Sequence, residues 1–167
     1  MEKRDYDKLY YYNDSYYKGE FMESLHYLLM KSNAMLSRRI LSEAGRLGLT
    51  PGQPKVLEFL LRHGESDQKT IAAYCEIEPA TVGSILLRME EGGLILRKQK
   101  AGNRRSLYVS LTEKGLEAAN RMTDVFHDAE TAAAAGLSDG ESARLRELLD
   151  KLCTAMESQN EGKKNKT

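Results

Sequence analysis

The sequence contains few of the residues from which metal sites and disulfides are built. Its 167 residues include only two cysteines and three histidines. Cys75 and Cys153 lie far apart, no Cys-x-x-Cys occurs and the histidines share no ligand spacing, so a structural zinc site is not expected. A disulfide is not expected either, because thiols stay reduced in the cytosol. We therefore predict that the chain holds no metal and no cofactor.

Long apolar runs are also missing. No stretch approaches the roughly 18 apolar residues that a membrane-spanning helix needs. The N-terminus is polar and lacks the apolar segment of a signal peptide. The length suits a single domain with a real core. We expect a cytoplasmic protein with no membrane partner.

Signatures of catalysis are absent as well. No glycine-rich turn follows a strand, as a cofactor-binding domain would require, and no Ser-His-Asp or Cys-His arrangement is suggested. The chain also has no room for a separate cofactor domain of the kind that methyltransferases carry. We therefore expect that the protein is not an enzyme.

The net charge is zero, with 25 basic and 25 acidic residues. This balance argues against a general polyanion binder but not against a local DNA-binding face, because screening makes charges within roughly 10 Å matter most. Residues 94–110 contain five basic residues and no acid, so the remainder carries 0 − 5 = −5. The basic five are Arg97, Lys98, Lys100, Arg104 and Arg105.

Apolar residues recur at three- and four-residue steps through most of the chain, which predicts a mainly α-helical protein. Long helices are expected over 20–47, 112–135 and 138–157. A shorter helix should begin near Thr50, with Thr50 as its cap, Pro51 in its first turn and Gln53 completing a capping box. Ser138 and Glu141 predict a second capping box.

The segment between these helices is the most informative one. Asp67 should cap a short helix that ends near Cys75, and a second helix is expected over 79–91. A strand over 94–98, a loop over 99–105 and a return strand over 106–111 should follow. A helix-turn-helix over 67–91 with a β-hairpin wing over 94–111 is a winged helix. Such a fold fits DNA with its second helix in the major groove and its hairpin on the neighbouring backbone or minor groove.

The outer helices hold more apolar surface than a winged helix of about 60 residues could cover. We therefore predict a homodimer joined through these long helices. The expected organisation is a tyrosine-rich arm over 1–18, the winged-helix domain over 19–157 and a polar, frayed tail over 158–167. The arm is either a poorly ordered terminus or a segment packed on a partner subunit.

Several phrases, in their order and spacing, are similar to those of one family of regulators. They are Leu49-Thr50-Pro51-x-Gln53-x-x-Val56-Leu57, Gln68-Lys69-x-Ile71-Ala72, Pro79-Ala80-Thr81-Val82, Gly93-Leu94-Ile95 with Arg97, and Asn103-Arg104-Arg105-Ser106 followed by 109–115. From about residue 21 to residue 156 the chain resembles the MarR family of bacterial and archaeal winged-helix regulators. The resemblance implies a dimeric DNA-binding transcription factor, often a repressor released by a small ligand or by thiol oxidation.

The turn of the helix-turn-helix departs from the family pattern at two positions. Glu76 replaces the usual glycine, which should cost some backbone strain. Glu78 stands where a Ser or Thr usually caps the recognition helix. Its carboxylate suits the helix dipole but lies poorly beside phosphates.

Candidate DNA contacts come from three segments. At least one of Arg104 and Arg105 is expected on phosphate or in the minor groove, the alternative being a solvated hairpin tip. Lys98 and Lys100 should contact phosphates. Arg88 should bond a guanine edge, or else a phosphate or Glu91. The groove-facing and backbone-facing set from the two helices is completed by Gln68, Lys69, Ala80, Thr81 and Ser84.

An effector, expected to be a small aromatic molecule, would bind between the outer helices and the winged-helix core. The candidate lining residues, for each of which ordinary core packing or solvent exposure is the alternative, are Tyr27, Met30, Phe59, His63, Met122 and Phe126. Cys75 is predicted to be a buried, inert thiol rather than a redox switch, and Cys153 an interface thiol.

The leading hypothesis is a homodimeric, sequence-specific transcriptional regulator that binds double-stranded DNA at a pseudo-palindrome and represses by occluding a promoter. Its half-sites would lie about one helical turn apart. The alternative is a winged helix used for protein contact, without sequence-specific DNA binding.

Overall fold

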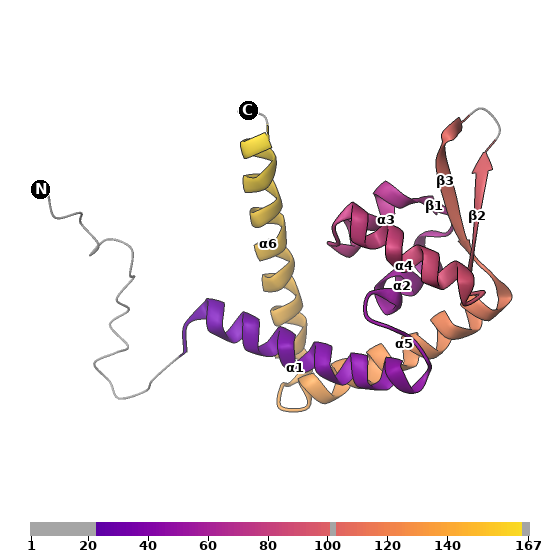
Figure 1. Cartoon of the computed structure of the whole chain (residues 1–167). Coiled ribbons are helices and arrows are strands. Elements are labelled where there is room, and N and C mark those ends of the chain that lie inside the picture. Colours follow the sequence, from indigo (N-terminus) through magenta and orange to yellow (C-terminus); the bar gives the residue numbers. More distant parts are fainter. Residues whose placement is uncertain (1–22, 101–102, 165–167) are drawn as a thin grey trace, which may run out of the picture. The chain divides into compact units, whose positions relative to one another are not determined.

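The computed structural model describes residues 23–100 and 103–164, with side chains described for 23–99 and 107–158. The chain separates into two compact units, Met1–Ser37 and Arg38–Thr167. Helix α1 (Leu25–Arg46) contributes residues to both units, and all other described helices and strands belong to the second (Figure 1). They are α2 (Gln53–His63), β1 (Ser66–Asp67), α3 (Gln68–Cys75), α4 (Pro79–Glu91), β2 (Ile95–Lys100), β3 (Asn103–Leu111), α5 (Glu113–Ala134) and α6 (Asp139–Lys164).

Five of the six described helices, α1 to α5, contribute residues to the core in the expected mainly helical arrangement. A small antiparallel sheet is the only sheet in the described part of the chain. Helix α2 packs along α5, and α3 packs on α4. Val56 and Leu57 of α2 and Met122 of α5 are fully buried, together with the inner stripe of α4. The predicted fold class, mainly α with a β-hairpin wing, is confirmed.

The start of α2 differs from its prediction. The helix begins at Gln53 rather than near Thr50, and Pro54 rather than Pro51 occupies the first turn. The cap is Gly52, whose φ of 88° is a left-handed conformation that favours glycine. The Gln53 side chain still closes half of the expected capping box, because its Oε1 accepts from the Thr50 N–H at 2.9 Å. Thr50 itself provides no side-chain cap.

The long helices also shift at their ends. Helix α1 starts at Leu25, later than the expected residue 20, and α6 continues to Lys164, so the tail predicted to fray from residue 158 is helical over most of its length. The polar residues there lack an apolar pattern, yet most of them are good helix formers. The capping box of α6 was predicted correctly, since Glu141 accepts from the Ser138 N–H at 2.8 Å. Helix α5 is capped by Thr112, which accepts from the Gly115 N–H at 3.0 Å. The tyrosine-rich arm, 1–18, lies outside the described residues.

The sheet has the order β1-β3-β2. Strand β1 was not predicted, because two residues are too short to show a pattern; Asp67 lies opposite Tyr108 of β3. The predicted loop over 99–105 is wrong. Strand β2 runs to Lys100 and β3 restarts at Asn103, and residues 101–102 lie outside the described part. The backbone ladder extends through charged residues that bury no apolar side, so alternation in the sequence could not reveal it.

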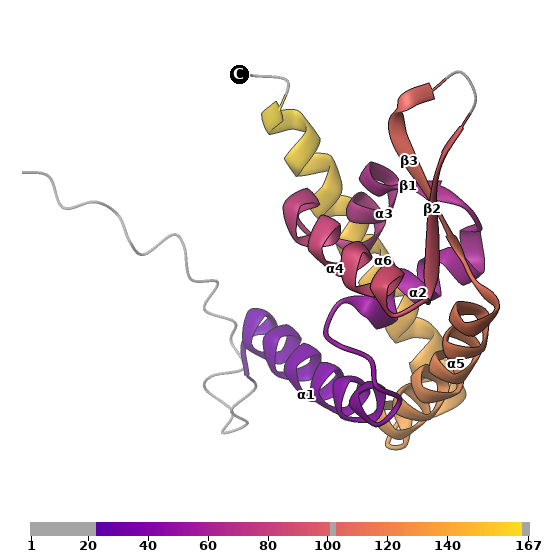
Figure 2. The same cartoon turned by 45° about the vertical axis from the view of Figure 1, so that its right-hand side comes forward.

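The base of the wing is fixed to α5. The Leu94 carbonyl accepts from the Thr112 N–H at 3.1 Å, and the Thr112 hydroxyl donates to the Gly93 carbonyl at 2.7 Å. Lys114 Nζ donates to the Gly92 carbonyl at 2.8 Å. A side chain at Gly115 would place its Cβ only 1.9 Å from the Leu94 oxygen. The hairpin therefore projects from a rigid junction, beside α4 (Figure 2).

Candidate nucleic-acid interface

The helix-turn-helix is built as the sequence predicts. Asp67 caps α3, with its Oδ1 accepting from the Lys69 N–H at 2.9 Å and the Thr70 N–H at 3.1 Å. These hydrogen bonds to the backbone and hydroxyl of Thr70, and to Lys69, hold the pKa of the Asp67 carboxyl below its ordinary value. At the other end of α3, Glu76 has a φ of 52°, and it is the only described non-glycine residue with a positive φ. The strain expected for a carboxylate residue at this turn is therefore present.

Helix α4 has the bounds and the inner stripe that the sequence predicts. The stripe is buried and consists of Val82, Ile85, Leu86 and Met89. The predicted groove-facing residues Ala80, Thr81, Ser84 and Arg88 are all exposed. The Ser84 hydroxyl only reaches back to the Ala80 carbonyl at 3.4 Å, a long bond that it can exchange for a base edge. The Glu78 side chain makes no capping hydrogen bond to α4.

Two residues at the start of α3 were also predicted to contact DNA. Lys69 is exposed, as a phosphate contact requires. Gln68 is half-buried, and its Nε2 donates to the Pro79 carbonyl at 3.1 Å, so it joins the first turn of α3 to the first turn of α4. Gly83 leaves room for this side chain, since a Cβ there would lie 3.3 Å from Gln68 Nε2. One hydrogen of the Gln68 amide remains available to a phosphate.

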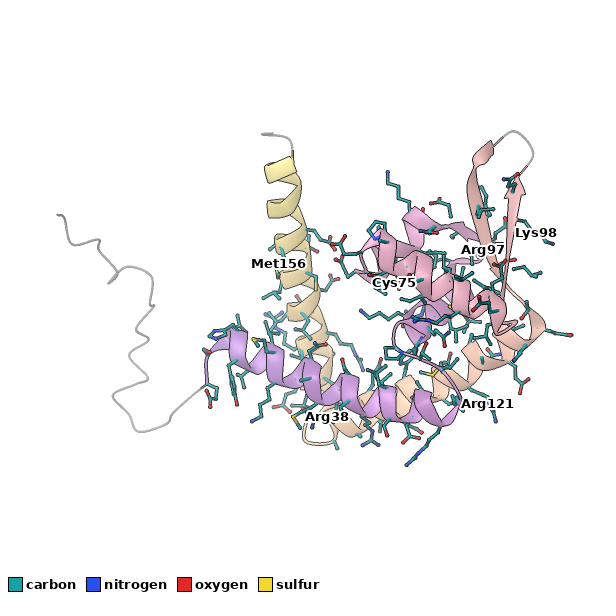
Figure 3. All side chains as sticks on the ribbon, in the orientation of Figure 1. Arg38, Cys75, Arg97, Lys98, Arg121 and Met156 are labelled. Carbon is teal, nitrogen blue, oxygen red and sulfur yellow. The ribbon has the colours of Figure 1, made fainter. Side chains whose placement is uncertain are left out.

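Side-chain alternation along β2 places neighbouring basic residues of the wing on opposite faces of the strand. Lys98 is exposed, whereas its neighbour Arg97 points toward α4 and donates from Nε to Glu90 Oε2 at 2.8 Å; Figure 3 labels both on the hairpin. The Arg97 guanidinium also donates to the same oxygen through Nη2. It holds the pKa of the Glu90 carboxyl below its ordinary value. Arg97 therefore braces the wing against the recognition helix rather than facing solvent.

The other wing cations, Lys100, Arg104 and Arg105, lie in strands whose backbone is described, but their side chains lie outside the described residues. The register explains one feature of this region. Gln99 pairs with Leu107 and Lys100 with Asn103, so β3 has extra residues, 104–106, where β2 has none. Such an irregularity locally disrupts the ladder and increases the twist of the hairpin.

Arg88 has no ion pair with Glu91 in the part of the chain with described side chains, which leaves its guanidinium available for a base or a phosphate. It borders a hollow of about 560 Å³ between α4, α5 and the segment before α2. The same hollow contacts Lys114 and Arg121, and Figure 3 labels Arg121 on α5. Three basic residues therefore border the C-terminal end of the recognition helix, and the acidic Glu117 lines the same hollow.

A buried four-residue stripe on the inner side of the second helix, whose outer side is exposed, lies next to a braced basic hairpin. This is the geometry of a winged helix-turn-helix, and comparison with known proteins agrees. Residues 49–107 match the model of the MarR family. The homoprotocatechuate degradative operon repressor of Escherichia coli is 30% identical over 117 residues, which cover 70% of this chain and 78% of the repressor. The chain belongs to the MarR family.

Solved structures match the fold of this chain over more than the residues 49–107 that match the family model. A probable transcriptional regulator from Pseudomonas aeruginosa is 27% identical with a TM-score of 0.69, covering 78% of this chain and 97% of that one. A putative MarR-family regulator from Listeria monocytogenes, solved with a 26mer DNA, has a TM-score of 0.77 at 20% identity and covers 83% and 92% of the two chains. This MarR-family chain is accordingly a DNA-binding transcriptional regulator with the winged helix-turn-helix fold.

The predicted effector residues of this MarR-family chain fall into three environments. Phe59 is buried, and its ring stacks on that of the exposed His63 at 4.8 Å and meets Tyr74 at 4.9 Å. These three rings border an open hollow of about 620 Å³ between α2 and α3, and Tyr74 had not been singled out from the sequence. Met122 is fully buried in the core, with Phe126 packed against it. Tyr27 and Met30 are exposed in the first unit.

Of the two cysteines of the MarR-family chain, Cys75 has the buried environment predicted for it, and the interface role predicted for Cys153 stays a prediction. Cys75 is buried, and burial raises the pKa of its thiol, which keeps it protonated and unreactive. Cys153 is exposed on α6. Among the described residues, no group of three or more histidine, cysteine or acidic side chains could hold a metal ion, and no described helix is long and apolar enough to cross a membrane.

Proposed function

We propose that this regulator represses transcription as a homodimer that binds a pseudo-palindromic operator and is released by a small aromatic ligand. The observation that carries the proposal is the recognition helix α4. Its inner stripe is fully buried, while its outer residues are small or polar, exposed and available to base edges. Acting on chromosomal DNA, the protein would work in the cytoplasm.

The proposed contacts divide by chemistry. Lys69, Lys98 and Lys100 would bind phosphates, and Gln68 would approach the backbone from α3. At least one of Arg104 and Arg105 would lie on phosphate or in the minor groove. Ala80, Thr81, Ser84 and Arg88 would face the major groove. A bidentate contact between Arg88 and guanine would discriminate by roughly 1–3 kcal/mol.

Dimerisation is supported by the outer helices. Helix α6 exposes Leu145, Leu148 and Met156, with Leu148 at 48% exposure, and makes little contact with the rest of its own unit. Most of the stability of a helix in a protein comes from packing of its apolar face, and a second copy of the same stripe would cover this one. We propose that α1, α5 and α6 form the dimer interface of a domain over 19–157.

In the proposed repression mechanism, the dimer holds its two winged helices at a fixed spacing and occludes the promoter. Half-sites about one helical turn, roughly 34–36 Å, apart would receive one recognition helix each. A ligand that binds more tightly to a dimer with a different spacing would reduce DNA affinity by shifting that equilibrium. An aromatic ligand is supported by the predicted lining residues and by the E. coli relative, which is named for the degradation of an aromatic acid.

Selection of genomic DNA fragments by the purified protein, followed by sequencing, tests the proposal. We expect an enriched motif with two-fold symmetry, bound more weakly at higher salt because phosphate contacts release counterions. A selected motif without symmetry would contradict the dimer. Absence of any salt-sensitive enrichment would instead favour a winged helix used for protein contact.

A further inference from the structure

The recognition helix carries one large apolar side chain on the side that faces away from the core. Leu87 is 47% exposed, although the other large apolar residues of α4 are buried. Periodicity had assigned the inner stripe but not this residue. An exposed leucine alone is common on protein surfaces. Leu87, however, lies on the recognition helix, on the face that would enter the major groove.

Helical geometry places Leu87 near the centre of the outer face. Residues three or four apart lie in one row along a helix, so Ala80, Ser84, Leu87 and Glu91 form a single ridge. Each member of this ridge is exposed. At about 100° per residue, the ridge lies opposite the buried stripe, and Arg88 lies to one side of it. Leu87 therefore projects more directly outward than Arg88 does.

The major groove offers one apolar group that suits such a side chain, the 5-methyl group of thymine. Guanine presents its N7 and O6 acceptors at the same depth, and cytosine presents its amino group beside a C5–H that lacks the methyl group. A leucine pressed against them would remove those atoms from water without supplying a hydrogen bond. A leucine on the groove-facing ridge thus favours thymine by attraction and disfavours G·C pairs by desolvation.

We propose that Leu87 is a specificity-determining residue that contacts a thymine methyl group in each half-site of the operator. This inference rests on the proposed function, since it requires α4 to occupy the major groove. It assigns an A·T pair to a defined part of the site. The first turn of α4, with Ala80 and Thr81, would read one end of the half-site, and Leu87 would read a pair toward the other end.

Deletion of single methyl groups from the DNA tests the contact. Each thymine of the selected operator is replaced in turn by deoxyuridine, which lacks only the 5-methyl group, and affinity is measured for the full-length protein. Burial of one methyl-sized group corresponds to about a fourfold change in affinity. We expect one symmetric pair of positions at which wild-type protein loses about fourfold for each half-site.

Two protein variants, each measured on the thymine and deoxyuridine operators, show whether Leu87 makes the contact. Leu87→Ala should bind the thymine and deoxyuridine operators equally well at that pair of positions, with affinity reduced toward that of wild type on deoxyuridine DNA. Leu96→Ala is the matched control, since Leu96 is a leucine of β2 with 45% exposure and lies off the recognition helix. It should keep the full preference for thymine. Circular dichroism confirms that both variants are folded.

Three results would contradict the inference, and they distinguish its failure from failure of the proposed function. An unchanged thymine preference in Leu87→Ala overturns the inference while leaving the proposed function intact. Sensitivity to deoxyuridine at no position also overturns it. Failure of the wild-type protein to select any DNA defeats the proposed function itself, and the inference with it.

Discussion

Two carboxylates at the DNA-binding surface have structural roles, and neither is a simple surface charge. Asp67 accepts three hydrogen bonds at the start of α3, two from backbone N–H groups and one from the Thr70 hydroxyl. Glu90 accepts from Arg97 and joins α4 to β2. In both cases the pKa of the carboxyl is lowered, so the ionised form is the one that stabilises the fold. The stabilisation is present above the ordinary carboxyl pKa and is lost as pH falls through the lowered value.

Substitutions of Asp67, the cap of α3, distinguish the contribution of its hydrogen bonds to the free energy of unfolding from that of its charge. Asp67→Ala should lower the free energy of unfolding by about 1 kcal/mol at neutral pH, because the N–H groups of Lys69 and Thr70 lose their acceptor. Asp67→Asn should retain most of this stability. The wild type should approach the Asn variant as pH falls through the lowered pKa of Asp67, where this carboxylate becomes protonated. Urea unfolding across pH measures all three proteins, and a constant gap between wild type and Asp67→Asn would contradict the assigned role of the charge.

The brace between wing and recognition helix should be weaker. Glu90→Gln is expected to lower the free energy of unfolding by about 0.5 kcal/mol, because Glu90 is partly exposed and solvent screens the pair. The loss should shrink in high salt and at acid pH, and amide exchange should quicken at the base of β2. Arg46→Gln removes an exposed helical ion pair and serves as a control that leaves the wing unaffected. Equal exchange rates in β2 for both variants would show that the brace does not order the hairpin.

At the scale of elements, local chemistry determined what the sequence could predict. The bounds of α4 were predicted correctly because Pro79 opens the helix and Gly92-Gly93 ends it. The wing was predicted too short because its outer ladder depends on backbone hydrogen bonds with no apolar alternation. Leu87 was overlooked, although its position opposite the inner stripe was readable from a helical projection. The residues assigned to an effector pocket come from distant segments, so their proximity depends on tertiary packing that periodicity does not encode.

The junction between α5 and the wing is expected to tolerate no side chain. Gly115→Ala should lower the free energy of unfolding by about 1–3 kcal/mol, because its Cβ would overlap the Leu94 carbonyl oxygen. Gly45→Ala is the matched control, as a Cβ there meets nothing within 4 Å and alanine favours the helix. It should be neutral or stabilising by up to about 1 kcal/mol. Thermal unfolding compares the two, and an unaffected Gly115→Ala would show that the junction is not tightly packed.

At the scale of the whole molecule, the function depends on charge placement and on symmetry. The net charge is zero, so we expect attraction to DNA to be local, and we propose that it comes from the wing and the start of α3. The exposed apolar stripe of α6 supplies a reason for two copies to associate. Neither feature alone gives sequence recognition. The account requires two recognition helices presented at the pitch of duplex DNA.

Changing the spacing of the selected operator tests that requirement most directly. We would insert about five base pairs, half a helical turn, at the centre of the symmetric site and measure the affinity of the purified protein. A rigid dimer predicts a fall in affinity to the level of non-specific DNA, because the second half-site turns to the opposite side of the duplex. Unchanged affinity for the expanded site would contradict the account, since it would mean that each winged helix binds independently.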